Sequence, residues 1–260
     1  MNMKVRSQYT PSCPEQLKNA ASLENLCHGS DGNTVILKKG RNTVALFQTP
    51  EGEKYVIKSF KKPNIIQRIA YTFFTSGKAI RAYRNAKKLR EAGINTPHEA
   101  SYVEVLEKGL IGNSYFVCRH CDALNLLDSW VWTSPYDKTI LDILVKHLVM
   151  MHTKGVLHGD TNLGNFLYHP DTGTIDVIDT NRTRFKSTLS PKECLDNMVR
   201  LTHRRELLED IVRHYAAARG WDVAKCAAYI LTALDRYEHK RHRHDKLKNC
   251  IKKLSHEQPT

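Results

Sequence analysis

The sequence lacks the features that mark membrane-spanning, disulfide-stabilised and zinc-binding proteins. No run approaches the roughly 20 apolar residues that a transmembrane helix needs, and no signal peptide precedes the seven cysteines. Because these cysteines are odd in number and scattered along the chain, we expect free thiols and a cytoplasmic protein. Cys118 and Cys121 form a C-x-x-C without a second pair, which disfavours a zinc site.

Acidic residues are also scarce. The 260 residues include 40 Lys and Arg against 27 Asp and Glu, which gives a formal net charge of +13, and no acid occurs between Tyr55 and Arg90. Such a surface suits polyanions, but charge alone does not choose between nucleic acid, an anionic membrane face and a phosphorylated or carboxylated glycolipid. No aromatic RNA-binding motif accompanies the basic tail from His239 to Lys253, so we expect no nucleic-acid partner.

One stretch of the chain combines the side chains that phosphoryl transfer requires. His158-Gly159-Asp160 follows an apolar pair, Asn165 comes five residues after Asp160, and a turn and an apolar strand then lead to Asp179. A carboxylate can accept the proton of an attacking hydroxyl, and hard oxygen atoms can hold Mg²⁺ against a triphosphate. The order of residues therefore predicts Asp160 as the catalytic base, with Asn165 and Asp179 as metal ligands that bind Mg²⁺ and ATP. The simpler alternative is a β-hairpin with solvated acids.

Three antiparallel strands are predicted ahead of this stretch, because apolar segments alternate with turn residues. They span residues 35–37, 43–47 and 54–60. The third strand contains Lys58, about a hundred residues before Asp160, which makes it the expected phosphate-binding lysine. The first turn contains Gly40 but no G-x-G-x-x-G, so the backbone amides of residues 38–42 would have to cover the phosphates. A plain β-turn is an equally open interpretation of this segment.

Two helices are predicted within the acid-free stretch. Apolar residues recur about every four positions between Pro63 and Thr75, and this stripe either packs onto the protein or docks on a membrane face. A second helix, 78–92, takes the place of the kinase helix that gives a glutamate to the phosphate-binding lysine. Its only acid is Glu91, in the last turn, so the acidic partner of Lys58 stays open.

The segments HGDTNLGNF and IDTNR, which contain the predicted metal ligands and base, resemble the lipopolysaccharide core kinases. This Kdo/heptose kinase family belongs to the protein-kinase-like superfamily, together with aminoglycoside and choline kinases. The resemblance covers roughly residues 35–184 and implies an α+β, protein-kinase-like bilobal fold. Residues 1–33 have few periodic features and several turn residues, which indicates an N-terminal extension. We expect a small antiparallel β-rich N-lobe (34–119) and a larger helical C-lobe (120–260) to follow it and to form one bilobal domain.

The sequence departs from protein kinases after Asp179. Only about ten residues separate Asp179 from Ser190-Pro191-Lys192-Glu193, which has the pattern of a capped helix start. A long activation segment ending in A-P-E is therefore absent, and Gly159 replaces the arginine of H-R-D. Both differences favour a small or sugar acceptor over a peptide.

The motif and the resemblance together imply ATP-dependent, Mg²⁺-assisted phosphorylation of a sugar hydroxyl, in Kdo or heptose of the lipopolysaccharide inner core. An enzyme that acts on this glycolipid is expected in the cytoplasm, with peripheral contact to the anionic inner face of the inner membrane as a further expectation. Two alternatives stay open: a kinase of another small molecule, such as an aminoglycoside or a choline-like alcohol, and a catalytically silent kinase-like scaffold that binds polyanions. The sequence leaves open the adenine contacts and the oligomeric state.

Overall fold

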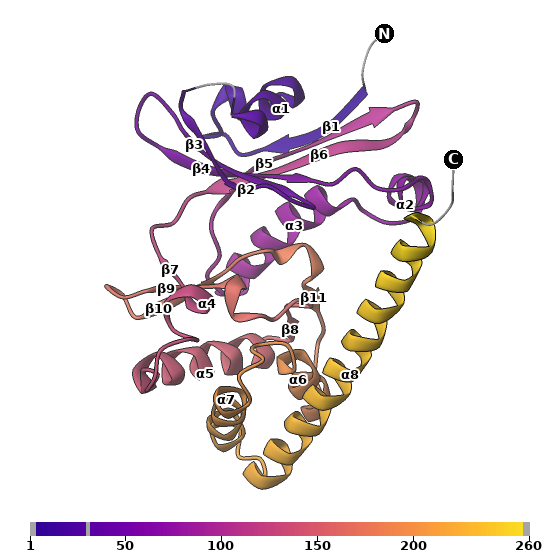
Figure 1. The fold of residues 1–260 in the computed structure, drawn as a ribbon. Coiled ribbons are helices and arrows are strands. Elements are labelled where there is room, and N and C mark those ends of the chain that lie inside the picture. Colours follow the sequence, from indigo (N-terminus) through magenta and orange to yellow (C-terminus); the bar gives the residue numbers. More distant parts are fainter. Residues whose placement is uncertain (1–3, 30–31, 257–260) are drawn as a thin grey trace. The chain divides into compact units, whose positions relative to one another are not determined.

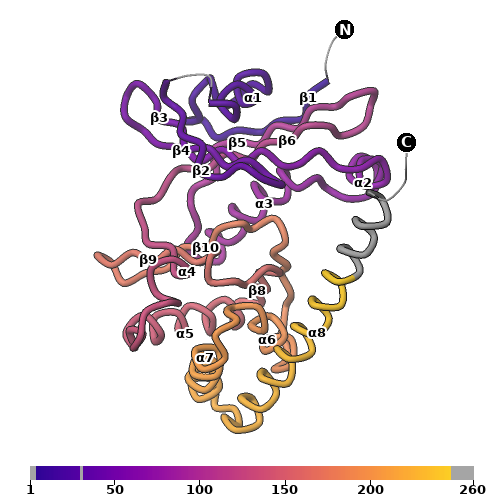
Figure 2. Tube along the Cα trace, in the orientation of Figure 1, coloured from indigo at the N-terminus to yellow at the C-terminus, as the bar shows by residue number. Residues whose placement is uncertain are grey.

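The computed structural model describes residues 4–29 and 32–256, with side chains described as far as residue 246. Figure 1 shows the helices and strands, and Figure 2 traces the chain that connects them. By internal packing the chain divides into two units. We call Met1–Leu124 with Leu167–Thr183 the sheet unit, and Asn125–Phe166 with Arg184–Thr260 the helical unit.

The sheet unit is built on a six-stranded antiparallel sheet with the order β1-β5-β6-β4-β3-β2. Its strands are β1 (Lys4–Tyr9), β2 (Thr34–Lys38), β3 (Thr43–Gln48), β4 (Lys54–Phe60), β5 (Glu99–Glu107) and β6 (Leu110–Arg119). Strands β2, β3 and β4 confirm the three strands predicted from the sequence. In β4, buried Tyr55 and Ile57 alternate with more exposed residues, as expected for a strand with one covered face. Lys58 pairs in register with Val44 of β3 and Phe116 of β6, which places it in the middle of the sheet.

Residues 4–9 form a strand of this sheet, which differs from the expectation of a separate N-terminal extension. Strand β1 pairs along its whole length with β5. It is followed by η1 (Glu15–Leu17) and α1 (Ala20–His28), and α1 lies on the face of the sheet opposite to α3 (Lys78–Glu91) (Figure 1). Leu23 of α1 is fully buried in the same core cluster as Ile57. Five of the six residues of β1 are exposed, so no apolar periodicity marks this strand in the sequence.

The apolar stripe that follows β4 lies on the surface. Helix α2 (Ile65–Ile69) continues into a single π-helical turn, η2 (Ala70–Phe74), and neither segment has a buried residue. Five large side chains of these segments are 43–80% exposed, namely Ile65, Ile66, Ile69, Phe73 and Phe74. The hypothesis that the stripe packs onto the protein is therefore wrong for these five residues, which we call the apolar patch.

Helix α3 confirms the helix predicted over residues 78–92. It packs against β5 and β6, and its buried side chains are Ala79, Ile80, Ala82, Tyr83, Ala86 and Leu89. Gly93 follows the helix in a left-handed conformation (φ 69°), which glycine adopts without a steric penalty. Further along the chain, β9 (Phe166–His169) and β10 (Thr174–Val177) form a small sheet with β7 (Leu124–Asn125), in the order β10-β9-β7.

The helical unit contains α4 (Leu126–Ser129), α5 (Lys138–Thr153), β8 (Val156–Leu157), η3 (Leu163–Asn165), β11 (Arg184–Phe185), α6 (Pro191–Met198), α7 (Arg205–Ala218) and α8 (Val223–His256). The apolar stripe of α5 is buried, with Leu141, Leu144, Leu148 and Met151 fully enclosed. Helix α6 begins with the predicted capping box, in which the side chains of Ser190 and Glu193 each accept a hydrogen bond from the other residue's backbone N–H. The basic tail that begins at His239 continues α8 as helix.

An antiparallel sheet followed by a set of helices agrees with the predicted α+β class. Between residues 4 and 256, apart from the gap at 30–31, no helix is both long enough and apolar enough to cross a membrane. The long α8 is the clearest case, because charged residues occur throughout its second half.

The N-terminal segment supplies a test of the fold. Leu23→Ala is expected to lower the free energy of unfolding by about 2–5 kcal/mol, because it removes a fully buried side chain from the core of the sheet unit. Val35→Ala, at a side chain that is 60% exposed, is the matched control and should change it by less than about 0.5 kcal/mol. Urea unfolding measures both variants. Equal, small effects would mean that α1 is a detachable extension.

Candidate active site

Lys58 and Asp179 meet within the sheet unit. The Lys58 ammonium lies 2.7 Å from Oδ1 of Asp179, and the two side chains are only 17% and 29% exposed. This contact supplies the acidic partner of Lys58 that the sequence left open. Glu91, the only acid of α3, is exposed at the end of the helix, so the helix that carries a glutamate in protein kinases carries none beside Lys58 in this chain.

The backbone at Asp179 has a conformation that non-glycine residues rarely adopt. Its φ and ψ are 58° and 47°, in the left-handed region. The side chain of Asn181 donates a hydrogen bond to the Asp179 carboxylate, and the 3₁₀ turn η4 (Thr180–Arg182) begins immediately after it. The tight turn therefore brings the carboxylate out of strand β10 and towards Lys58. Non-glycine residues in this region cluster at functional sites, where the surrounding contacts hold them in place.

Helix α3 holds this turn through its backbone and one amide side chain. Nδ2 of Asn85 donates to the carbonyl oxygens of Thr180 (2.8 Å) and Thr183 (3.2 Å). The hydroxyl of Thr180 donates in return to the backbone carbonyl of Ala82 in α3. Helix α3 thus holds the turn that follows Asp179 and does not itself place a carboxylate beside Lys58. Sequence reasoning missed Asn85, because a single amide in a basic helix gives no recognisable pattern.

Gly40 lies in the exposed turn between β2 and β3. A Cβ added at this position would meet nothing within 4 Å, and its backbone is not in the left-handed region. The fold itself therefore does not require glycine at this position. The role of this turn as a phosphate cover stays a prediction.

The loop that carries Asp160 lies in the helical unit. It follows β8, which pairs with β11, and Gly159 has a φ of 75°, so the residue between the histidine and the aspartate must tolerate a left-handed backbone. Nδ2 of Asn165 donates to the backbone carbonyl of Asp160 (2.8 Å), as does the backbone N–H of Asn162 (2.9 Å). The loop thus fixes the predicted base and the predicted metal ligand relative to each other. Because the Asn165 amide nitrogen is used in the loop, its Oδ1 is the atom suited to a cation.

Asp160 also contacts an arginine that sequence reasoning missed. The guanidinium of Arg200 lies 2.8 Å from Oδ1 of Asp160, and it stacks over the ring of Tyr237 at 5.6 Å. Arg200 follows α6, forty residues after Asp160, so nothing in the local motif indicates it. A cavity of about 240 Å³ opens at this point, and its lining includes Gly159, Arg184 and Arg200. The ion pair fixes the orientation of the Asp160 carboxylate.

A buried histidine supports the same loop. His152 of α5 contacts the Tyr215 hydroxyl through Nδ1 (2.9 Å) and Oδ1 of Asn197 through Nε2 (3.2 Å). Since the amide oxygen can only accept, Nε2 carries the proton and Nδ1 accepts from Tyr215. The backbone carbonyl of Asn197 in turn accepts a hydrogen bond from the hydroxyl of Thr161, the residue after Asp160. Burial lowers the pKa of His152 to about 4, so the imidazole is neutral at physiological pH.

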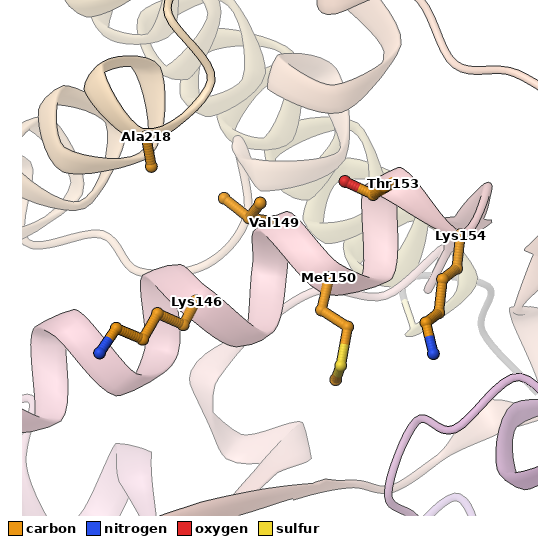
Figure 3. A pocket seen from close by; sticks show the side chains of 6 residues that line it. All are labelled: Lys146, Val149, Met150, Thr153, Lys154 and Ala218. Carbon is orange, nitrogen blue, oxygen red and sulfur yellow. The ribbon is translucent and has the colours of Figure 1, made fainter.

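A second cavity of the helical unit, about 280 Å³, lies away from these residues. Figure 3 shows the side chains from α5 and α7 that line it, which are Lys146, Val149, Met150, Thr153, Lys154 and Ala218. None of the predicted site residues is among them, and the lining includes no acid. This cavity therefore has no part in the proposed chemistry.

Cys121 lies beside His169 and Asp176 in the sheet unit, with one potential ligand atom of each within 4.8 Å of the others. Burial comes first and Asp176 second among the causes that raise the pKa of the Cys121 thiol to about 11. Burial likewise raises the pKa of Cys118 to about 12. Both thiols are therefore protonated at neutral pH, and the described cysteines are free. The group is a hydrogen-bonded cluster around Asp176.

The residues present fit a nucleotide and a divalent cation. Asp179 and Asn165 offer a carboxylate and an amide oxygen, which are the hard ligands that Mg²⁺ prefers. Lys58 offers a largely buried ammonium group 2.7 Å from Asp179. The sheet unit thus has, at one place, a positive group that suits phosphate oxygens and a carboxylate that suits a metal ion. The donor set includes no thiolate or imidazole that would favour a softer metal.

Comparisons with known proteins agree with this chemistry. The family described as "Lipopolysaccharide kinase (Kdo/WaaP) family" matches residues 15–224. Among solved structures, the chain is similar to WaaP in complex with acyl carrier protein, with a TM-score of 0.58, 17% sequence identity, and coverage of 90% of this chain and 98% of that chain. It is also similar to amicoumacin kinase hAmiN in complex with AMP-PNP, Ca²⁺ and Ami (TM-score 0.52, 13% identity, 78% and 81% coverage). No curated protein matches the chain. These likenesses confirm the predicted protein-kinase-like fold.

The neutral state of His152 predicts how stability depends on pH. The folded protein keeps His152 unprotonated down to a pKa of about 4, whereas the unfolded chain takes up the proton near the model value of 6.5. The contribution of His152 is therefore fully present above pH 6.5 and is lost as the pH falls towards 4. One proton of difference corresponds to a slope of about 1.4 kcal/mol per pH unit.

His152→Gln should therefore flatten the decline of the unfolding free energy between pH 6.5 and 4 by about that slope. His239→Gln, at an exposed position of α8, is the matched control and should keep the parent slope. Urea unfolding at a series of pH values gives both slopes. A His152→Gln variant with the full parent slope would show that the imidazole is not buried in its neutral form.

Proposed function

Because the chain belongs to the lipopolysaccharide kinase (Kdo/WaaP) family, we propose that it phosphorylates a hydroxyl group of Kdo or heptose in the lipopolysaccharide inner core, with ATP and Mg²⁺. The observation that carries this proposal is the pairing of Lys58 with Asp179 at 2.7 Å. In kinases a lysine on the corresponding strand binds phosphates, and an aspartate at the corresponding strand end binds metal. The ordered loop of Asp160 and Asn165 supports it.

Each of the predicted site residues has a distinct role. ATP supplies the phosphoryl group, and Mg²⁺ offsets the charge of the triphosphate. Asp179 and Asn165 bind the cation through their oxygen atoms, and Lys58 binds phosphate oxygens through its ammonium group. Asp160 accepts the proton of the sugar hydroxyl on its carboxylate. In this chain the guanidinium of Arg200, 2.8 Å from Oδ1 of Asp160, orients this carboxylate.

A sugar acceptor is favoured over a peptide by the short connection after Asp179. Strand β11 pairs with β8 at Arg184 and Phe185, and α6 begins at Pro191. The chain between Asp179 and α6 thus has no room for a long peptide-binding segment. The alternative of a silent scaffold rested on the missing helix glutamate, and the contact between Lys58 and Asp179 supports the kinase over this alternative because it gives Lys58 an acidic partner.

Phosphate transfer from radiolabelled ATP to purified lipopolysaccharide core tests this function. Asp160→Asn should lower turnover by roughly 10²- to 10⁴-fold, the usual effect of losing a positioned base, and should leave nucleotide binding intact. Asp171→Asn, in the exposed turn between β9 and β10, is the matched control and should keep full turnover. Mass spectrometry of the product identifies the sugar. Near-normal turnover in Asp160→Asn would refute the assignment of the base, and no transfer by the wild type would refute the acceptor.

We further propose that the enzyme contacts the anionic membrane surface through the apolar patch. Arg68 of α2 donates to the backbone carbonyl of Ile111 at 2.6 Å, and the hydroxyl of Thr72 accepts the N–H of the same residue. The patch is therefore fixed to β6 and does not collapse onto the sheet. Lys61, Lys62 and Lys78 flank it in the sequence, and each basic residue beside anionic lipid contributes about 1 kcal/mol, an attraction that salt weakens. The apolar side chains would add a contribution that salt does not screen.

Binding to vesicles with anionic lipid tests this contact. The wild type should sediment with such vesicles, less so at high salt, and Phe73→Asp should weaken the binding further. Phe73 is 68% exposed, so the variant should keep the parent melting temperature. Trp132→Asp, at a 75% exposed aromatic residue of the helical unit, is the matched control. Undiminished binding by a folded Phe73→Asp variant would remove the patch from the contact.

A further inference from the structure

A small pocket in the sheet unit is lined by cations from several segments of the chain. Its volume is about 240 Å³, and its lining residues are Arg41, Lys61, Lys62, Asn64, Gln67 and Lys78. Arg41 comes from the turn before β3, the two lysines follow β4, the amides belong to the start of α2, and Lys78 is the first residue of α3. No acid is among the lining residues. We call it the cationic pocket.

The position of these residues is fixed by the backbone. Oδ1 of Asn42 accepts the backbone N–H of Lys61 (3.1 Å), which joins the turn before β3 to the end of β4. Oδ1 of Asn64 accepts the backbone N–H of Gln67 (2.9 Å) and so caps α2. The cations therefore stand on ordered elements and converge because the fold brings those elements together.

Lys78 has an unusual environment for a half-buried ammonium group. Burial comes first among the causes that lower its pKa, followed by the positive charges of Arg41, Arg182, Arg81 and Lys58. The charged neighbours that lower the pKa of Lys78 are thus all cations. A cluster of this kind is stabilised by an anion, since desolvation and like charge both act against the protonated amine.

The acids of this region are already engaged. Asp179 pairs with Lys58, and Glu107 pairs with Lys62 and Arg68. Glu104 lies buried beneath the start of α3, where a Cβ on Gly77 would clash with its carboxylate, and burial raises its pKa. None of these three carboxylates lines the cationic pocket. The remaining positive charge of Arg41, Lys61 and Lys78 therefore faces the pocket.

We propose that the cationic pocket binds a phosphate-type oxyanion carried by the acceptor, so that it anchors the sugar through a second, charged group. This inference rests on the proposed kinase function. A pocket of about 240 Å³ is smaller than the roughly 300–1,000 Å³ of sites for drug-sized ligands, so it suits a charged group and not a whole nucleotide. Arg41 would supply a bidentate contact, and the two lysines would act as point charges.

The pocket does not include the lysine and the aspartate of the sheet unit that are assigned to the nucleotide phosphates and the metal. Neither Lys58 nor Asp179 lines it, although the charge of Lys58 reaches Lys78. Lys61 lies three residues beyond Lys58, which along an extended chain is about 10 Å. An anion bound there would lie near the phosphate-binding lysine without replacing the triphosphate. That is the arrangement needed by an acceptor that presents its hydroxyl beside the phosphates.

Steady-state kinetics with a phosphorylated core acceptor test the proposal. Lys78→Gln and Arg41→Gln should each raise the KM for this acceptor roughly 10- to 100-fold, the scale of one lost charged hydrogen bond. The dissociation constant of AMP-PNP–Mg²⁺ should stay at the parent value. Lys87→Gln on α3 removes the same charge at an exposed position outside the pocket, and should change neither quantity.

A binding measurement that needs no turnover separates this proposal from the kinase function. Inorganic phosphate, titrated calorimetrically into protein saturated with AMP-PNP–Mg²⁺, should bind the wild type and bind Lys78→Gln at least tenfold more weakly. Loss of phosphate binding when the nucleotide is present, or weaker AMP-PNP binding in Lys78→Gln, would assign the pocket to the nucleotide and overturn the proposal. Unchanged acceptor KM and unchanged phosphate binding in both pocket variants would overturn it as well. A wild type that binds phosphate in this way but transfers none would refute the kinase function alone.

Discussion

The ion pair between Lys58 and Asp179 is the interaction on which the proposed site depends. It joins the middle of the antiparallel sheet to the turn after β10, and both side chains are largely removed from water. Such a pair is favourable only where its geometry is held and its remaining hydrogen bonds are satisfied. Asn181 satisfies the carboxylate, and Asn85 of α3 holds the turn that presents it. The left-handed backbone at Asp179 is the local strain that this arrangement tolerates.

This pair also explains how helix α3 can lack an acid beside Lys58. In protein kinases a glutamate from this helix holds the phosphate-binding lysine, whereas here Asp179, the predicted metal ligand, contacts Lys58. The polar side chains of α3 can therefore be basic, and its first residue, Lys78, lines the cationic pocket. The apolar patch lies in the segment just before it, so the stretch without acids combines two surfaces that suit an anionic glycolipid. Both proposals rest on the same excess of positive charge.

Much of the fold was predictable because local patterns and tertiary packing agree. The strand that contains Lys58, the helix over residues 78–92 and the capping box of α6 each appear in the structure as expected. The membership of β1 in the sheet was not predictable, because five of its six residues are exposed and its partner, β5, is nearly a hundred residues away. The exposure of the patch was not predictable either, since an apolar stripe has the same period whether it meets a core or water.

The sequence by itself determined the identity and order of the chemical groups: the loop with Asp160 and Asn165, the strand that ends at Asp179, the lysine of β4 and the absence of acids around it. These follow from residue types and short spacings, which act over one turn or one strand. Only the tertiary structure decided which groups meet. Arg200 reaches Asp160 across forty residues, Asp179 reaches Lys58 across more than a hundred, and Arg41, Lys61 and Lys78 converge from separate segments. Such contacts depend on how the elements pack, and no local pattern encodes them.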